Sequence, residues 1–161
     1  MKLFMTTLIL SALVAVSATS VAAPARSARS ACTPKPVTVK GHPGVIECGP
    51  AKAVVRFKGK TLRYKGGTCK RQAGALFLYI GTHVTGGSSD HLFYLYMQLK
   101  PVKTYTPSTG LVGIQLGYAS YHWKTGSLTV TAGAKSGTFK GTFVKFPETK
   151  TSGAFSGSYT C

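Results

Sequence analysis

The chain has 161 residues, and its 20 Lys and Arg residues against three Asp and Glu residues give a net charge of +17 at pH 7. The acids Glu47, Asp90 and Glu148 lie far apart in the sequence, which argues against catalysis by a pair of carboxylates. A length of this order suits one domain with a buried core, and the strong positive field indicates anionic partners.

The N-terminus has the order of a secretory signal peptide. Lys2 precedes a mostly apolar run over Leu3–Val16, and small residues follow up to Ala25. The run is shorter than the ~20 apolar residues of a membrane anchor, so we expect residues 1–25 to be removed by cleavage after Ala22 or Ala25. A flexible leader, 26–36, and a single β-domain, 37–161, would then form a secreted or extracellular protein without a transmembrane segment, either free or associated with the cell wall.

A basic β-hairpin over Ala53–Lys65 is the central predicted element, and two short strands, Val37–Lys40 and Val45–Cys48, precede it. Its turn is expected at Lys58-Gly59-Lys60. Because strand side chains alternate between two faces, the apolar residues of both arms would face a core and the basic residues would face away from it. The two faces consist of Val55, Phe57, Leu62 and Tyr64, and of Arg56, Lys58, Arg63 and Lys65.

Four cysteines, Cys32, Cys48, Cys69 and Cys161, remain in the exported chain. An even number in an oxidising compartment predicts two disulfides, and sequence alone cannot choose among the three pairings. We favour Cys32–Cys48, which would hold the N-terminal segment, and Cys69–Cys161, which would tie the last strand to the one after the hairpin. No Cys-x-x-Cys pair is present, so we expect no zinc site.

After the hairpin, apolar runs alternate with glycine-rich breaks. His91–Leu99 is the most apolar run of the mature chain, and its aromatic residues favour a strand over a helix. Another strand is expected at Leu76–Gly81, with the loop His83–Asp90 between the two. Further elements are predicted at Val102–Thr106 (an edge strand or a loop), at Leu111–Trp123 (interrupted at Gly117-Tyr118), at Ser127–Thr131 and from Ser136 onward.

The C-terminus repeats the pattern G-x-F-x-G-[ST]-[FY], at Gly137–Phe143 and at Gly153–Tyr159. We expect two antiparallel neighbours joined by the loop Pro147–Ser152, with glycines at bulges or close backbone approaches. Together the elements predict an all-β fold, an antiparallel β-sandwich or β-barrel of about eight to ten short strands.

Four segments carry a resemblance to a known family: Val45–Cys48 (VIEC), Val112–Tyr118 (VGIQLGY), Ser136–Phe143 (SGTFKGTF) and Ser156–Cys161 (SGSYTC). They resemble small secreted envelope proteins of actinobacteria and are similar to the mycobacterial 19 kDa lipoprotein antigen family. The resemblance implies a non-enzymatic, surface-exposed β-domain with a disulfide that reaches the last strand. The chain departs from the family because it lacks a lipoprotein cleavage box before Cys32, has an extra cysteine pair and is strongly basic.

The basic cluster around the hairpin is the candidate binding site. Its predicted anion-binding residues are Arg56, Lys58, Lys60, Arg63, Lys65, Lys70 and Arg71, in a stretch that contains no acid. Clustered Lys and Arg bind phosphate-, sulfate- or uronate-bearing polymers through charge neutralisation and counterion release. The alternative is a solvated sheet face whose lysines protect an edge against aggregation. The sequence leaves both interpretations open.

Aromatic residues form a second candidate. Tyr118, Tyr121 and Trp123 lie close together, and an exposed row of such rings could stack on sugars or bases. Burial in the core is the alternative explanation for most tyrosines.

Residues suited to catalysis gather in one loop, where His83, Ser88, Ser89, Asp90 and His91 lie close in sequence. No Gly-x-Ser-x-Gly elbow surrounds the serines, and the spacing matches no known metal motif. We interpret the segment as a polar loop and expect neither enzymatic activity nor a cofactor.

The function predicted from the sequence is that of a secreted, non-enzymatic, cationic β-domain that associates with anionic polymers or surfaces of the cell envelope. The alternative is a secreted effector, either a cationic antimicrobial or an enzyme inhibitor with a protein partner.

Overall fold

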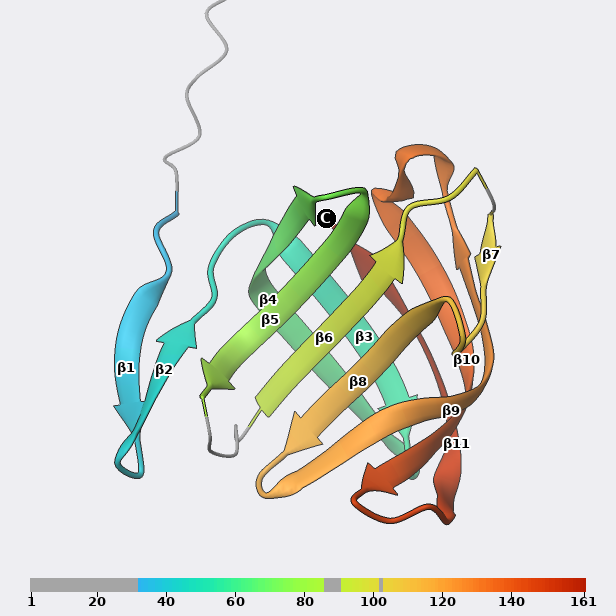
Figure 1. Cartoon of the computed structure of the whole chain (residues 1–161). Coiled ribbons are helices and arrows are strands. Elements are labelled where there is room, and N and C mark those ends of the chain that lie inside the picture. The colour runs from blue at the N-terminus through green and yellow to red at the C-terminus, as the bar shows by residue number, and fades with distance from the viewer. Residues whose placement is uncertain (1–31, 86–90, 102) are drawn as a thin grey trace, which may run out of the picture.

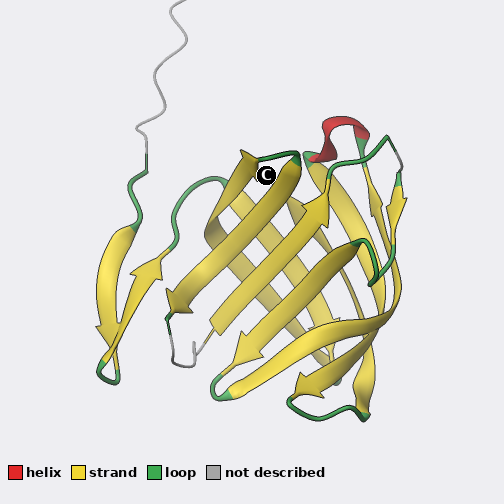
Figure 2. Cartoon of the chain, in the orientation of Figure 1, coloured by secondary structure: helices red, strands yellow, loops and turns green. Residues whose placement is uncertain are grey.

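The computed structural model describes residues 32–85, 91–101 and 103–161, which form one antiparallel sheet of 11 strands and a short 3-10 helix (Figures 1 and 2). The predicted signal peptide and residues 26–31 of the predicted leader lie outside the described residues. The elements are β1 (Lys35–Val39), β2 (His42–Ile46), β3 (Ala51–Phe57), β4 (Lys60–Gln72), β5 (Ala75–Val84), β6 (His91–Gln98), β7 (Thr104–Tyr105), β8 (Gly110–Leu116), β9 (Ala119–Val130), η1 (Ala132–Ala134), β10 (Ser136–Phe146) and β11 (Thr151–Thr160).

Most of these strands close into a barrel. In the order β3, β4, β5, β6, β8, β9, β10, β11, each strand pairs antiparallel with the next, and β11 pairs with β3 to complete the ring (Figure 1). The short β7 pairs with β9 outside this ring. The predicted all-β fold is confirmed. Of the two architectures predicted, a sandwich or a barrel, the structure has the barrel.

The β1–β2 hairpin lies beside the barrel, where β2 pairs with the end of β5. The disulfide Cys32–Cys48 joins the chain before β1 to the chain after β2, as predicted. The predicted leader is too long, because Lys35 and Pro36 already pair with Ile46 and Val45 of β2.

Aromatic side chains fill the interior of the barrel. The rings of Phe143 and Phe155 stack with their centroids 3.7 Å apart, and Phe57 meets Phe143 edge-on at 5.2 Å. The other buried rings include Tyr64, Phe93, Tyr105, Tyr121, Trp123, Phe139 and Tyr159. An eight-stranded barrel has an interior just wide enough for side chains or one small ligand, and here the aromatic core occupies it. A binding site would therefore lie on the outside of the barrel or at its ends.

The C-terminal repeat pairs with itself, because β10 and β11 are antiparallel neighbours, as predicted. In register, each glycine of one strand lies opposite an aromatic residue of the other. These pairs are Gly137 with Tyr159, Phe139 with Gly157, Gly141 with Phe155, and Phe143 with Gly153. A Cβ on Gly137 would meet the ring of Tyr159, and a Cβ on Gly157 would meet the ring of Phe139. At these two positions the missing side chain leaves room for the facing ring and favours this register.

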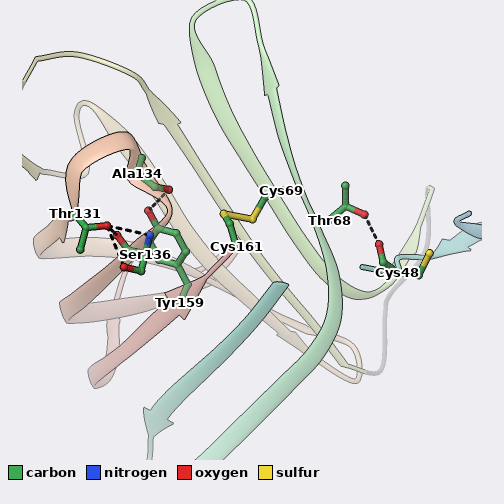
Figure 3. Close-up of a disulfide and its surroundings, with 8 residues drawn as sticks. All are labelled: Cys48, Thr68, Cys69, Thr131, Ala134, Ser136, Tyr159 and Cys161. Carbon is green, nitrogen blue, oxygen red and sulfur yellow. Dashed lines mark hydrogen bonds between the residues drawn. A yellow bond between two sulfur atoms is a disulfide. The ribbon is translucent and has the colours of Figure 1, made fainter. Parts of the chain in front are cut away.

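The second disulfide, Cys69–Cys161, also forms as predicted (Figure 3). Strand β3 lies between β4 and β11 but begins only at Ala51, which pairs with Gly67. Beyond that point the disulfide joins β4 directly to the residue after β11. It therefore closes the barrel where the hydrogen-bonded ladder of β3 has ended.

Candidate functional site

The basic hairpin forms from β3 and β4, and its residues lie on the predicted faces except for Lys58. Lys58 lies in the turn with its ammonium group over the rings of the core residues Phe57 and Tyr121, so its predicted place on the outer face is wrong. The residues of the predicted apolar face are buried, with Leu62 half-buried, while Arg56, Arg63 and Lys65 are exposed on the outside of the barrel. The turn consists of Lys58 and Gly59, whose φ angles are 50° and 72°. Two consecutive residues with positive φ match the twist of a hairpin, and glycine adopts this conformation without steric cost.

Two parallel rows of outward side chains cross five strands of the barrel. The first row, in the order β4, β3, β11, β10 and β9, consists of Arg63, Val54, Ser158, Thr138 and Thr129. The second row, in the same order, consists of Thr61, Arg56, Ser156, Lys140 and Ser127. The rows lie two residues apart along each strand, so they share one face and neighbour each other.

A shallow hollow of about 760 Å³ follows these rows, and we call it the outer groove. Its lining includes all ten residues of the two rows, together with the backbone of Phe139 and Gly157 between them. Five strands at a spacing of about 4.8 Å make it about 19 Å long. The outer groove is therefore an elongated surface that several units of a linear polymer could contact at once.

The outer groove combines cations with hydroxyl groups. Arg56, Arg63 and Lys140 are exposed, and Ser and Thr side chains supply most of the remaining surface. Among the described residues these three cations form no ion pair, and the salt bridge that does form joins Lys145 to Glu148 at 2.9 Å, away from the groove. The guanidinium groups can bind a phosphate, sulfate or carboxylate group through two parallel hydrogen bonds, and the hydroxyls can bind sugar or polyol oxygens.

The other predicted cations divide between the two ends of the barrel. Lys58 and Lys60 are at the hairpin tip, beside a second hollow of about 430 Å³ that Arg56 also lines. The Lys58 ammonium lies 5.2 Å from the ring centre of Tyr121. Lys65 is on the outside, and Lys70 is exposed near the opposite end of β4. The predicted cations therefore extend beyond the β3–β4 hairpin, from its tip to the opposite end of β4.

Arg71 does not belong to the outer face, so the prediction of one shared cationic face is wrong for this residue. The pairing of β3 with β4 skips Gly66, whose φ is 78°, and this extra residue reverses the alternation of the strand. Odd-numbered residues such as Arg63 point outward before the bulge, whereas Gly67 is buried and Cys69 packs against the core after it. Arg71 follows the same alternation and lines a separate pocket at the end of the barrel.

The predicted row of stacking rings is wrong for two of its three members. Tyr121 and Trp123 are in the core, since both occupy inward positions of β9, and the Trp123 indole donates a hydrogen bond to the carbonyl oxygen of Thr125 at 2.6 Å. Tyr118 is 78% exposed in the turn between β8 and β9. The Lys40 ammonium lies 4.3 Å from its ring centre and donates a hydrogen bond to its hydroxyl group.

Half-buried rings instead occupy the outside of β5, β6 and β9, and these rings were not predicted from the sequence. Phe77 contacts Tyr96 at 5.0 Å between ring centres, and His122 stacks on the exposed Phe146 at 5.6 Å. Burial lowers the pKa of His122. The period-two pattern of His91–Leu99 was the available signal, because it puts Tyr94 and Tyr96 on the face opposite Phe93 and Leu95.

The histidines of the predicted polar loop show no catalytic arrangement in the described part of the chain. His91 stacks on the buried Tyr64 at 4.1 Å, and His83 is at the outer side of β5. Ser88, Ser89 and Asp90 lie outside the described residues. Across residues 32–85, 91–101 and 103–161, no three His, Cys, Asp or Glu side chains gather as metal ligands would.

Comparison with known proteins gave no match, whether to protein-family models, to curated proteins or to solved structures. The resemblance to the 19 kDa lipoprotein antigen family therefore stays a prediction. Within the described part of the chain, no helix has the length and apolar character that crossing a bilayer requires.

Proposed function

We propose that this chain is an exported, non-enzymatic binding protein that attaches to anionic polymers of the cell envelope along the outer groove. The observation that carries the proposal is the alignment of Arg63, Arg56 and Lys140 with rows of Ser and Thr hydroxyls across five strands. A polymer that carries both anionic groups and hydroxyl groups, such as a sugar phosphate, a sulfated glycan or a polyuronate, has the complementary chemistry.

The absence of nearby carboxylates supports binding over a merely solvated surface. A basic face that serves only solubility works best with both signs of charge interspersed, whereas the groove lining contains only cations and neutral residues. Two disulfides in the structure are typical of proteins that fold in an oxidising compartment, in agreement with the proposed export.

Retention on polyanions tests the proposal. The groove variant is Arg56→Gln/Arg63→Gln/Lys140→Gln, and its matched control is Lys35→Gln/Lys124→Gln/Lys150→Gln, which removes the same charge from exposed residues elsewhere. On heparin, polyphosphate and isolated cell wall, the groove variant should elute at lower salt than the control. The slope of log affinity against log salt should fall by about 2–3 in the groove variant. A neutral dextran column should retain none of the proteins.

Equal elution of the groove variant and the control would show that net charge alone causes the retention and would overturn the proposal. Bacterial killing or inhibition of a protease at low concentration, without retention on cell wall, would favour the alternative of a secreted effector.

A further inference from the structure

A disulfide and several hydrogen bonds hold one corner of the barrel, at the end near η1 (Figure 3). The Tyr159 hydroxyl donates a hydrogen bond to the Ala134 carbonyl at 3.3 Å, and the Cys161 amide donates one to the Lys135 carbonyl at 2.7 Å. Cys161 is also joined to Cys69, two residues before Arg71. The end of β4 and the turn of η1 are therefore held in a defined position by a covalent bond and by hydrogen bonds.

The opposite side of this corner consists of residues between β6 and β7. The buried Tyr105 hydroxyl lies 3.2 Å from the Lys100 amide, which donates to it, and 3.4 Å from the Lys100 carbonyl, to which it donates. The Lys103 carbonyl accepts a hydrogen bond from the Val130 amide at 2.8 Å. The backbones of both lysines are therefore fixed to the barrel, although their ammonium groups are exposed.

Between these two sides is a pocket of about 300 Å³, which we call the mouth pocket. Arg71, Lys100 and Lys103 all line it, and its lining contains no acidic side chain. An Nη atom of Arg71 lies 3.9 Å from the position that a Cβ on Gly133 would occupy, so the guanidinium group lies beside the turn of η1.

Arg71 comes from β4 and the two lysines from the connection between β6 and β7, and the alternation after the bulge at Gly66 places Arg71 in the lining of the same pocket. Like charges that converge on one cavity repel each other, and an anion between them converts that repulsion into attraction. The volume is at the small end of ligand pockets. Leu99, Pro101 and Val130 contribute apolar walls beside the charged groups.

We propose that the mouth pocket binds one tetrahedral oxyanion, a phosphate or sulfate group, either as the free ion or as a terminal monoester. Arg71 would hold two of its oxygens through its planar guanidinium group, and Lys100 and Lys103 would neutralise the remaining charge. This site is separate from the outer groove, and it does not depend on the proposed function.

The test is a titration with inorganic phosphate, inorganic sulfate and glycerol 3-phosphate at constant ionic strength, followed by amide NMR shifts, with chloride as the reference anion. The resonances of Gly133 and Ala134 should move in a saturable way. In Arg71→Gln/Lys103→Gln the affinity should fall by about tenfold or more, while the groove variant should bind as the parent does. Both changed residues are exposed, and an otherwise unchanged amide spectrum verifies that the variant folds.

Tighter binding of glycerol 3-phosphate than of inorganic phosphate would identify a monoester as the occupant, and equal binding would identify the free ion. Shifts no larger with phosphate and sulfate than with chloride would overturn the proposal. So would equal affinity in the pocket variant and the parent, or loss of phosphate binding in the groove variant alone. Because polymer retention is measured separately, either proposal can fail while the other stands.

Discussion

The substitution Gly157→Ala tests whether glycine–aromatic pairing specifies the register of β10 and β11. A Cβ at this position would lie 2.6 Å from Cζ of Phe139 and would also contact Cε2 of that ring and the Val54 carbonyl oxygen. Carbon atoms in ordinary contact are about 3.5–4.0 Å apart, so the ring would have to retreat by about 1 Å. Phe139 is only 2% exposed and has Phe93 and Phe155 beside it, so it has no room to do so.

Overpacking of this kind costs about 1–3 kcal/mol. We expect a value near 2 kcal/mol for Gly157→Ala, because both a buried ring and a backbone carbonyl obstruct the methyl group. The melting temperature should then fall by roughly 5–10 °C for a domain of this size. Denaturant unfolding with intact disulfides can be followed by the fluorescence of Trp123, which is the single tryptophan of the chain and is buried in the barrel.

Two further variants separate the proposed cause from others. Ser158→Ala changes the next residue, which faces the outer groove, and should alter stability by no more than about 0.5 kcal/mol. In a Phe139→Leu background the cost of Gly157→Ala should shrink by about 1 kcal/mol, because the obstructing ring edge is gone. An unchanged cost in that background, or a cost below about 0.5 kcal/mol in the parent, would refute the reasoning.

Two further predictions concern the core and the disulfides. Among the described residues the buried Tyr64 hydroxyl has no hydrogen-bond partner, whereas that of Tyr159 bonds to Ala134, and burial raises the pKa of both tyrosines. Tyr64→Phe should therefore leave the free energy of unfolding unchanged or raise it by up to about 1–2 kcal/mol, while Tyr159→Phe should lower it by about 1 kcal/mol. A larger loss of stability in Tyr64→Phe than in Tyr159→Phe, measured by denaturant unfolding, would contradict this. Cys69→Ser/Cys161→Ser removes a link across 92 residues and should destabilise the barrel by about 4–5 kcal/mol in the chain-entropy estimate. Cys32→Ser/Cys48→Ser should barely change the unfolding transition followed by Trp123 fluorescence, because it frees only the β1–β2 hairpin beside the barrel. An equal loss of stability in the two double variants would be inconsistent with that placement.

Local patterns predicted the elements whose partners are close in sequence. The alternation in Ala53–Lys65 was sufficient to predict the basic hairpin. The C-terminal repeat was sufficient to predict the pairing of β10 with β11. The choice between sandwich and barrel was not available from such patterns. Both architectures have strands with one buried face, and closure depends on the pairing of β3 with β11, about one hundred residues apart.

The candidate sites were harder to predict, because each depends on a feature that composition does not reveal. The basic cluster identified Arg56 and Arg63, but Lys140 and the hydroxyl rows join them only through the register of β9, β10 and β11. Arg71 was assigned to the same face because the bulge at Gly66 was not recognised. The two glycines at positions 66 and 67 were the signal for that bulge, since glycine with positive φ is common there.

The barrel has to hold many like charges on its surface with few acids to balance them. Its aromatic interior and the Cys69–Cys161 link oppose the resulting repulsion. Three cations line the outer groove and three line the mouth pocket, without an acidic residue in either lining. An anion that binds either place of the folded chain more tightly than it binds the unfolded chain also raises the free energy of unfolding. Affinity and stability therefore report on the same contacts. A variant that loses an anion at one of these sites should lose the stabilisation by that anion as well, and it should keep the stabilisation that comes from the other site.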